Sequence, residues 1–149
     1  MFDIPQGVSD AAMIADNCQA EIQIQSQQTA SRYNHELEDL LTAAFNEGTS
    51  DEWRVDGNTE VQTATIVFAK SFIESLPAKL QNPTIAPEPD GDISIEWFAE
   101  KRRLLTASIN STGRIEWAAL LGNEDPRGSI QFSGNAPETI LFYLTRILA

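Results

Sequence analysis

The sequence predicts an α+β fold, in which N-terminal helices precede a four-stranded antiparallel β-meander and a C-terminal helix packs on the sheet. Three observations lead to this prediction. Apolar residues recur at helical spacing in two segments of the first half of the chain. Short segments of the second half alternate apolar and polar residues, with turn-forming residues between them. A last helical segment follows, and its apolar stripe needs a sheet face to cover.

The length and composition are those of one globular domain. The chain has 149 residues, of which 42% are hydrophobic, and a chain of this length can bury a core without cross-links. We therefore expect a single domain over residues 1–149. Residues 1–57 are its acidic, mostly helical N-terminal part, and residues 58–149 are its helix, meander and final helix.

The N-terminal part contains an ambiguous segment and a clear helix. Ser9 or Asp10 can cap a helix, but the later stretch AEIQIQSQ alternates as a strand does, so residues 20–30 fit either structure. Residues 32–48 carry apolar side chains at helical spacing, and Gly48 stands where a helix ends. The stretch TSDEWRVDGN that follows is predicted as a polar loop.

A second helix and an extended connector come next. Residues 58–76 carry a broad apolar stripe, and Pro77 ends this helix. The stretch QNPTIAPEPDGD contains three prolines, so we expect a stiff, extended connector. Its Pro-Asp-Gly is typical of a β-turn in which Gly91 has a positive φ, and it does not have the spacing of a calcium-binding loop.

Four strands and a last helix complete the predicted fold. The turn-forming stretches AEKR, NSTG and GNEDPRG separate the strands. Asn135 is predicted to cap the last helix, with Glu138 completing a capping box and Pro137 in the first turn. The predicted strands are residues 93–99, 103–109, 114–121 and 128–133, and the helix is residues 137–148.

The triplet Ile-Glu-Trp occurs twice, around Glu96 and Glu116. Alternate side chains of a strand share a face, so each Ile and Trp points one way and each Glu points the other way. Our interpretation places the Ile and Trp side chains under the helices and both Glu side chains toward water. The alternative is a small hydrolase in which Glu96 and Glu116 form the carboxylate pair of a glycosidase. It requires the two groups to lie close together beside a groove.

Charge and cysteine content argue against several classes of protein. The net charge is −12, which repels phosphate backbones, so we expect no direct nucleic-acid binding. Cys18 is the single cysteine, forms no internal disulfide and fits a reducing compartment. The sequence shows no secretory signal and no apolar run long enough to span a membrane. We therefore expect a cytoplasmic protein that does not contact membranes.

The sequence lacks the common motifs of catalysis and metal binding. It contains no Walker loop, no GxGxxG and no G-x-S-x-G. His35 is the only histidine, and a zinc site needs more ligands than one His and one Cys supply. We expect no catalytic residue, no metal and no cofactor, and hence a protein that is not an enzyme.

Three stretches within residues 52–148 are EWRVDGNTEVQTATIVFAKSFIESLP, PTIAPEPDGDISIEWF and PETILFYLTRI. On these stretches the chain resembles a widespread group of small uncharacterised bacterial proteins. The stretches are similar to the group's Trp-Asp-Gly loop, its helix ending in Leu-Pro, its Pro-Asp-Gly turn before a Glu-Trp strand, and its closing helix. In this chain two residues separate Trp53 from the Asp-Gly pair. The resemblance implies an α+β fold and a small accessory or partner protein, often encoded in compact gene pairs and on mobile elements.

The leading functional hypothesis is a non-enzymatic protein that binds and neutralises a protein partner, as an antitoxin or an immunity protein does. Acidic surfaces accelerate the encounter with a basic partner. Half of the acidic side chains lie in residues 1–57, where Arg32 and Arg54 are the only basic ones. The predicted partner-binding residues are Glu36, Glu38, Asp39, Asp51, Glu52, Trp53 and Asp56.

Two other hypotheses assign the protein a different role. One is an acidic inhibitor, encoded by a phage or another mobile element, of a nucleic-acid-binding defence complex. The other is a scaffold protein that forms a homodimer through an exposed strand of the meander.

Overall fold

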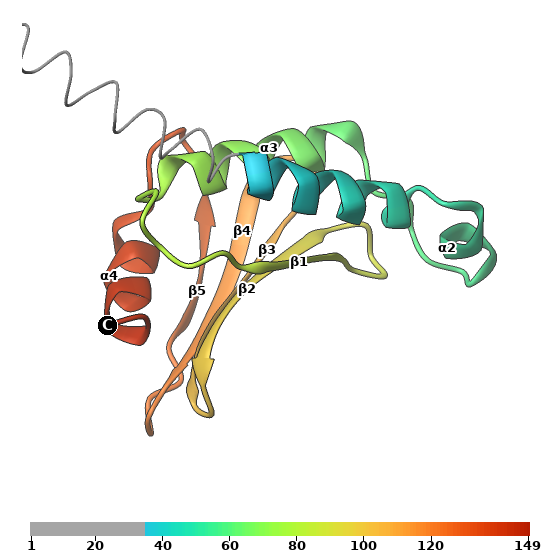
Figure 1. Cartoon of the computed structure of the whole chain (residues 1–149). Helices are drawn as coiled ribbons and strands as arrows, with labels where there is room; N and C mark the ends of the chain where they lie inside the picture. Colours follow the sequence, from blue (N-terminus) through green and yellow to red (C-terminus); the bar gives the residue numbers. More distant parts are fainter. Residues whose placement is uncertain (1–34) are drawn as a thin grey trace, which may run out of the picture.

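A computed structural model describes residues 35–149 of the chain (Figure 1). This part is an α+β fold, as predicted, with helices before and after an antiparallel sheet. The predictions for residues 9–30 and for Cys18 fall outside the described residues. The elements are a helix that includes residues 35–48, α2 (Asp51–Val55), α3 (Thr63–Ser75), β1 (Thr84–Pro87), β2 (Ile93–Glu100), β3 (Arg103–Ile109), β4 (Arg114–Leu121), β5 (Arg127–Gln131) and α4 (Glu138–Ile147).

The sheet is a meander of five strands in the order β1-β2-β3-β4-β5, and every neighbouring pair is antiparallel. The predicted bounds of β3 and β4 are confirmed, and those of β2 and β5 differ by one or two residues. The turn before β2 has the predicted form, because Gly91 has a φ of 92° and its N–H donates to the Glu88 carbonyl.

The prediction of four strands was wrong, because part of the proline-rich connector forms β1 on β2. Ile85 lies opposite Ile95, and Pro87 lies opposite Ile93. The Glu88 N–H donates to the Asp92 carbonyl, so the next residue back, Pro87, has its nitrogen on the outer side of the strand. A proline at that position costs no ladder hydrogen bond, which is why a proline-rich segment can form an edge strand.

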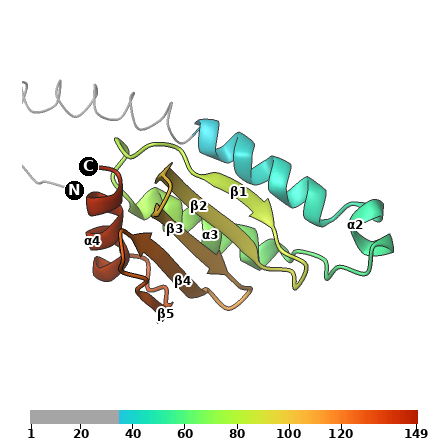
Figure 2. The same cartoon turned by 90° about the horizontal axis from the view of Figure 1, so that it is seen from below.

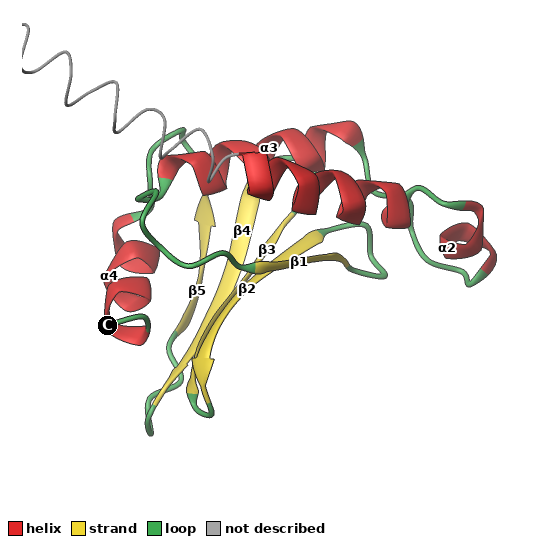
Figure 3. Ribbon diagram, in the orientation of Figure 1, coloured by secondary structure: helices red, strands yellow, loops and turns green. Residues whose placement is uncertain are grey.

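The helix of residues 35–48, α3 and α4 lie on one side of the sheet and enclose the core with it, whereas α2 lies beyond the sheet (Figure 3). The side chains of Ile95, Trp97, Ile115 and Trp117 are all buried on this face. The Phe72 ring of α3 meets the Trp97 ring edge-on at 6.2 Å. Our interpretation of the repeated triplet is therefore confirmed: Ile and Trp point into the core, and both Glu side chains lie on the opposite face.

The helix ends at Gly48, as predicted, and Gly48 also serves close packing. It is helical, buried and without a positive φ, and its carbonyl accepts a hydrogen bond from the Val61 N–H at 3.0 Å. A Cβ at this position would overlap Cγ2 of Val61 and would lie 3.1 Å from Cβ of Pro87. The absence of a side chain thus lets the helix approach the segment before α3 and the edge strand β1.

Several predicted helix ends also need correction. The predicted loop after Gly48 contains the short helix α2, with Ser50 as its N-cap. Helix α3 begins at Thr63 rather than at residue 58, because the N–H groups before it bond to other segments. Asn135 does not cap α4, whose N-cap is Pro137 without a side-chain hydrogen bond.

Candidate functional site

One face of the sheet is left uncovered by the described helices. In Figure 2, α3 lies behind β2 and β3, and the strands face the viewer. We call this surface the open face. Most side chains at the centre of the open face are small or carry a hydroxyl group, so they protrude little from the sheet. Charged side chains and a short apolar edge surround them. The residues of the open face are Thr84, Ala86, Ser94, Glu96, Phe98, Leu104, Thr106, Ser108, Arg114, Glu116, Ala118, Leu120, Arg127, Ser129 and Gln131.

The register of the sheet brings these residues together from five strands. Ala86, Ser94, Ser108, Glu116 and Ser129 form one row across the sheet. A shallow depression of about 480 Å³ lies over the β3–β5 side of the open face. Small side chains therefore form its floor, and larger charged side chains form its rim.

Three carboxylates crowd at one end of the open face. Oxygens of Glu88, Asp90 and Asp92 all lie within 4.8 Å of one another. The turn between β1 and β2 holds them there, since the Asp92 N–H donates to Oδ1 of Asp90 at 3.0 Å. The Ser108 hydroxyl donates to Oε1 of Glu88 and so fixes that carboxylate over the sheet.

The pKa of Asp92 in this cluster is raised to about 6, from an ordinary value of 3.8. Partial burial of the carboxyl group is the main cause, and the charges of Asp90, Glu88 and Glu116 add to it. Near neutral pH the three carboxylates therefore concentrate negative charge at this end of the open face. A positive group brought here from another molecule would be attracted to it.

Glu96 and Glu116 are both on the open face but belong to different local networks. The Thr106 hydroxyl donates to Oε2 of Glu96 at 3.2 Å. Glu116 accepts from Ser129 Oγ at 2.8 Å and from Arg114 Nε at 3.1 Å, and these hydrogen bonds lower its pKa. Strand β3 lies between them, and standard sheet spacings put their Cα atoms about 12 Å apart. Glu116 is thus held in its charged form, which does not suit a general acid.

The partner-binding residues predicted from the sequence fall into two groups. One group, Glu36, Glu38 and Asp39, lies near the start of the helix of residues 35–48. The other group, Asp51, Glu52, Trp53 and Asp56, lies on or just after α2, beyond the end of that helix. Most of that helix lies between Glu38 and Asp51. At the rise of about 1.5 Å per residue of an α-helix, the two groups are about 18 Å apart. The structure does not bring the predicted residues together into one surface.

The predicted acidic residues of the helix are also engaged within the fold. The Lys70 ammonium donates to Oε1 of Glu38 at 2.7 Å, and this hydrogen bond lowers the pKa of Glu38. The Asn82 amide donates to Oε2 of Glu36 at 2.7 Å. These contacts join the helix to α3 and to the segment before β1, so they have a structural role.

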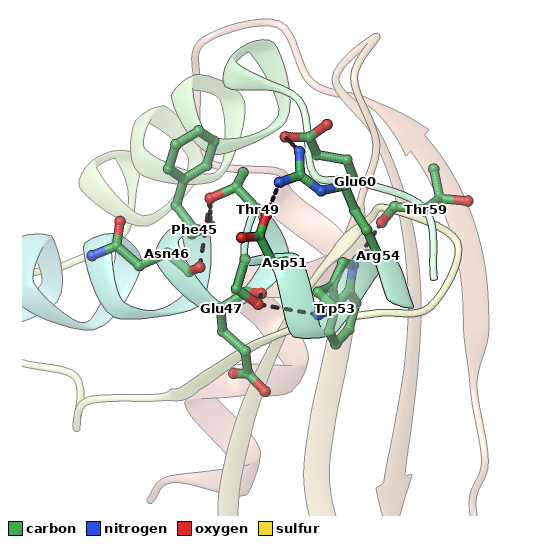
Figure 4. Close-up of polar contacts among 10 residues, drawn as sticks. Phe45, Asn46, Glu47, Thr49, Asp51, Trp53, Arg54, Thr59 and Glu60 are labelled. Carbon is green, nitrogen blue, oxygen red and sulfur yellow. Dashed lines mark hydrogen bonds and ion pairs between the residues drawn. The ribbon is translucent and has the colours of Figure 1, made fainter. Parts of the chain in front are cut away.

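Trp53 closes the loop around α2 (Figure 4). Its indole N–H donates to the Thr59 carbonyl at 2.7 Å, and its backbone N–H donates to the Ser50 hydroxyl at 3.2 Å. Arg54 forms ion pairs with Asp51 and with Glu60. The half-buried indole ring therefore fastens the loop, while Glu52 and Asp56 remain exposed.

Sequence reasoning missed the open face as a site. Glu88, Ser108 and Ser129 were not selected, because nothing in the linear sequence groups them. The usable signal was the alternation of polar residues opposite the buried ones in each strand, combined with the strand order.

Comparison with known proteins found no matching family model, no matching curated protein and no matching solved structure. Among residues 35–149, no helix is long and apolar enough to cross a membrane.

Proposed function

We propose that this protein is a non-enzymatic binding protein that receives a protein partner with a basic surface on the open face. The observation that carries the proposal is a five-stranded sheet with one face that no helix of residues 35–149 covers and that has crowded carboxylates at one end. A surface of short, hydroxyl-bearing side chains beside the carboxylates of Glu88, Asp90 and Asp92 supports the binding of a complementary protein surface.

The proposed role is neutralisation of the partner, as in antitoxins and immunity proteins. A partner that works on nucleic acid has the basic surface that the acidic rim attracts. We infer that the two proteins meet in the cytoplasm, where the single cysteine stays reduced. No metal, cofactor or catalytic residue takes part in this role.

The test compares two alanine-to-arginine variants of the full chain. Ala118 is exposed on the open face, and Ala43 is exposed on the helix of residues 35–48. Tagged wild-type protein, Ala118→Arg and Ala43→Arg are used to capture partners from the source cells, with mass spectrometry at low and moderate salt. Both variants add one positive charge. We expect one stoichiometric partner for the wild type and for Ala43→Arg, and at least tenfold less of it for Ala118→Arg.

Equal capture by Ala118→Arg would contradict the placement on the open face. A triple charge reversal of Glu36, Glu38 and Asp39 to Lys, in a folded variant, tests the surface predicted from the sequence in the same experiment. Loss of the partner with this variant alone would place the interface on the helix. Displacement of the captured partner by added nucleic acid would support the alternative hypothesis, in which the protein inhibits a nucleic-acid-binding complex.

A further inference from the structure

An apolar row crosses the open face near the β2–β3 turn. Phe98 lies opposite Leu104, and Leu104 lies opposite Leu120, so the three side chains stand side by side on neighbouring strands. Phe98 is 53% exposed, and the two leucines are half-buried. Among the five strands, Phe98 is the one large apolar residue that is exposed. Aromatic side chains are frequent anchors of protein interfaces, so the apolar row is a candidate contact.

The crowded carboxylates lie at the other end of the same face. Phe98 follows Asp92 by six positions along the chain, and at the rise of an antiparallel strand this distance is about 20 Å. Arg114, a basic residue of the open face at the carboxylate end, is engaged with Glu116 at 3.1 Å. The charges of Glu88, Asp90 and Asp92 are therefore left to attract a cation from another molecule.

The end of the sheet with the apolar row has the opposite excess of charge. The β2–β3 and β4–β5 turns lie together there, since Nε of Arg102 donates to the Gly122 carbonyl (Figure 1). Each acidic side chain of these turns forms an ion pair with an arginine; these side chains are Glu100, Glu124 and Asp125. Within residues 35–149, no ion pair engages Lys101 or Arg102. These two cations are the charges that remain for a partner.

We propose that the protein partner docks on the open face in a single orientation, fixed by the apolar row and by the opposite charges at the two ends. An apolar side chain of the partner contacts the apolar row, and a basic group faces the carboxylates about 20 Å away. An acidic group of the partner lies near Lys101 and Arg102. The inference rests on the proposed function and specifies the chemistry of the partner's surface. The reverse orientation would bring like charges together at both ends, which opposes binding.

A second copy of this chain is a poorer occupant of the open face. Two copies turned so that opposite charges meet would set the apolar row of each on the row that contains Ser94, Ser108 and Glu116 of the other. Burial of hydroxyl and carboxylate groups against apolar side chains is unfavourable. Each copy also has a net charge of −12, which repels the other copy. The partner is therefore a different protein.

The first measurement maps the charges of the two ends on the wild type, with two small nitroxide probes. One probe is a cationic aminomethyl nitroxide, and the other is an anionic carboxy nitroxide of the same ring. Each probe increases the NMR relaxation rates of the amide protons that it approaches. We expect the ratio of the cationic to the anionic effect to be at least about threefold higher at residues 90–92 than at residues 101–102. Equal ratios at the two ends would overturn the proposal.

The second measurement tests the apolar row with the purified partner that the wild type captures. Phe98→Ser is compared with Phe142→Ser, at a ring of α4 that is 55% exposed. Both variants remove the same ring at similar exposure, so they differ in the surface that is changed. We expect Phe98→Ser to weaken binding at least about tenfold and Phe142→Ser to change it by less than about threefold.

Asp90→Asn and Lys101→Glu test the orientation with the same partner. Asparagine keeps an oxygen that can accept the Asp92 N–H, so Asp90→Asn removes the charge and retains the turn. We expect each of the two variants to bind the partner at least about threefold more weakly. If net charge alone attracted the partner, Lys101→Glu would bind it more tightly, and that result would overturn the single orientation.

Failure of this inference is distinct from failure of the proposed function. Capture that falls with Ala118→Arg, combined with equal binding by Phe98→Ser and Phe142→Ser, would retain the function and remove the apolar row. Capture that Ala118→Arg does not change, or a wild type that captures no partner, would remove the function and this inference with it. A wild-type dimer in sedimentation that Phe98→Ser dissociates and Phe142→Ser does not would make a second copy the occupant.

Discussion

The guanidinium of Arg103 donates a 2.7 Å hydrogen bond to the backbone carbonyl of Ile147 and thereby ties the start of β3 to the end of α4. The same nitrogen lies 3.0 Å from the Arg146 carbonyl. The last carbonyls of a helix have no partner within the helix and carry partial negative charge, so a cation stabilises them.

We expect Arg103→Ala to lower the free energy of unfolding by about 1–3 kcal/mol, since it removes charge-assisted hydrogen bonds to the carbonyls at the end of α4, of which the one to Ile147 is part-buried. Denaturant unfolding of the variant and the wild type measures the difference. Lys101→Ala, at an exposed position of the neighbouring turn, is the control and should change stability by less than about 0.5 kcal/mol. Equal effects of the two substitutions would refute the role given to Arg103.

Gly48→Ala should destabilise the protein, although alanine is the better helix former. The added methyl group overlaps Val61, and overpacking of this kind costs about 1–3 kcal/mol, against about 1 kcal/mol gained in helix propensity. The substitution is measured alone and in a Val61→Ala background, where the overlap is relieved and the cost should shrink. A stabilised Gly48→Ala protein would show that the close approach is not required.

Asp92→Asn should make the protein more stable at pH 7 and leave its stability unchanged near pH 4. Folding raises the pKa of Asp92 to about 6, so the folded protein holds this proton more tightly than the unfolded chain does. The stability of the wild type therefore falls, relative to the variant, as the pH rises from about 4 to 6. The gain at pH 7 is about 1 kcal/mol after a discount for solvent exposure.

Unfolding free energies at several pH values between 4 and 8 provide the measurement for Asp92. Asp125→Asn, at an exposed carboxylate in the loop before β5, is the control for the removal of one negative charge. If the difference in unfolding free energy between Asp92→Asn and the wild type stays constant over this pH range, the raised pKa of Asp92 is contradicted.

Trp53→Phe should lower stability by about 1 kcal/mol without affecting partner capture. The variant keeps an aromatic ring but loses the hydrogen bond to the Thr59 carbonyl, so the loop around α2 opens more often. Unfolding experiments and limited proteolysis of the loop measure this. Val55→Ala, at a position 84% exposed on the same short helix, is the control. Reduced capture by a stable Trp53→Phe protein would restore the loop as the partner surface.

Local patterns predicted the sheet well where the decisive information lies between neighbours in sequence. Alternation and turn residues gave the bounds of β3 and β4, and the Pro-Asp-Gly turn gave the positive φ of Gly91. Strand β1 was missed because its prolines favour an irregular segment. Whether Pro87 is tolerated depends on which side of the strand its nitrogen faces, and only the pairing with β2 determines that.

The candidate site was harder to predict than the fold. Glu36, Glu38 and Asp39 stand out in the sequence because they are adjacent, yet the ion pair of Glu38 with Lys70 joins residues 32 positions apart. The influence of Glu116 on Asp92 arises only because β3 aligns β2 with β4. Such proximity comes from strand register, which a single sequence does not specify.

The neighbour-to-neighbour order of the five strands has a consequence for how the chain folds. Each hairpin closes only a short loop, and short loops have a low entropic cost of closure. The contact between Asn82 and Glu36 instead joins positions 46 residues apart. Topologies dominated by near-sequence contacts fold fast for their size. The contact between Arg103 and Ala149 also joins positions 46 residues apart. Among residues 35–149, therefore, the larger entropic penalties of folding come with docking the helices that flank the meander.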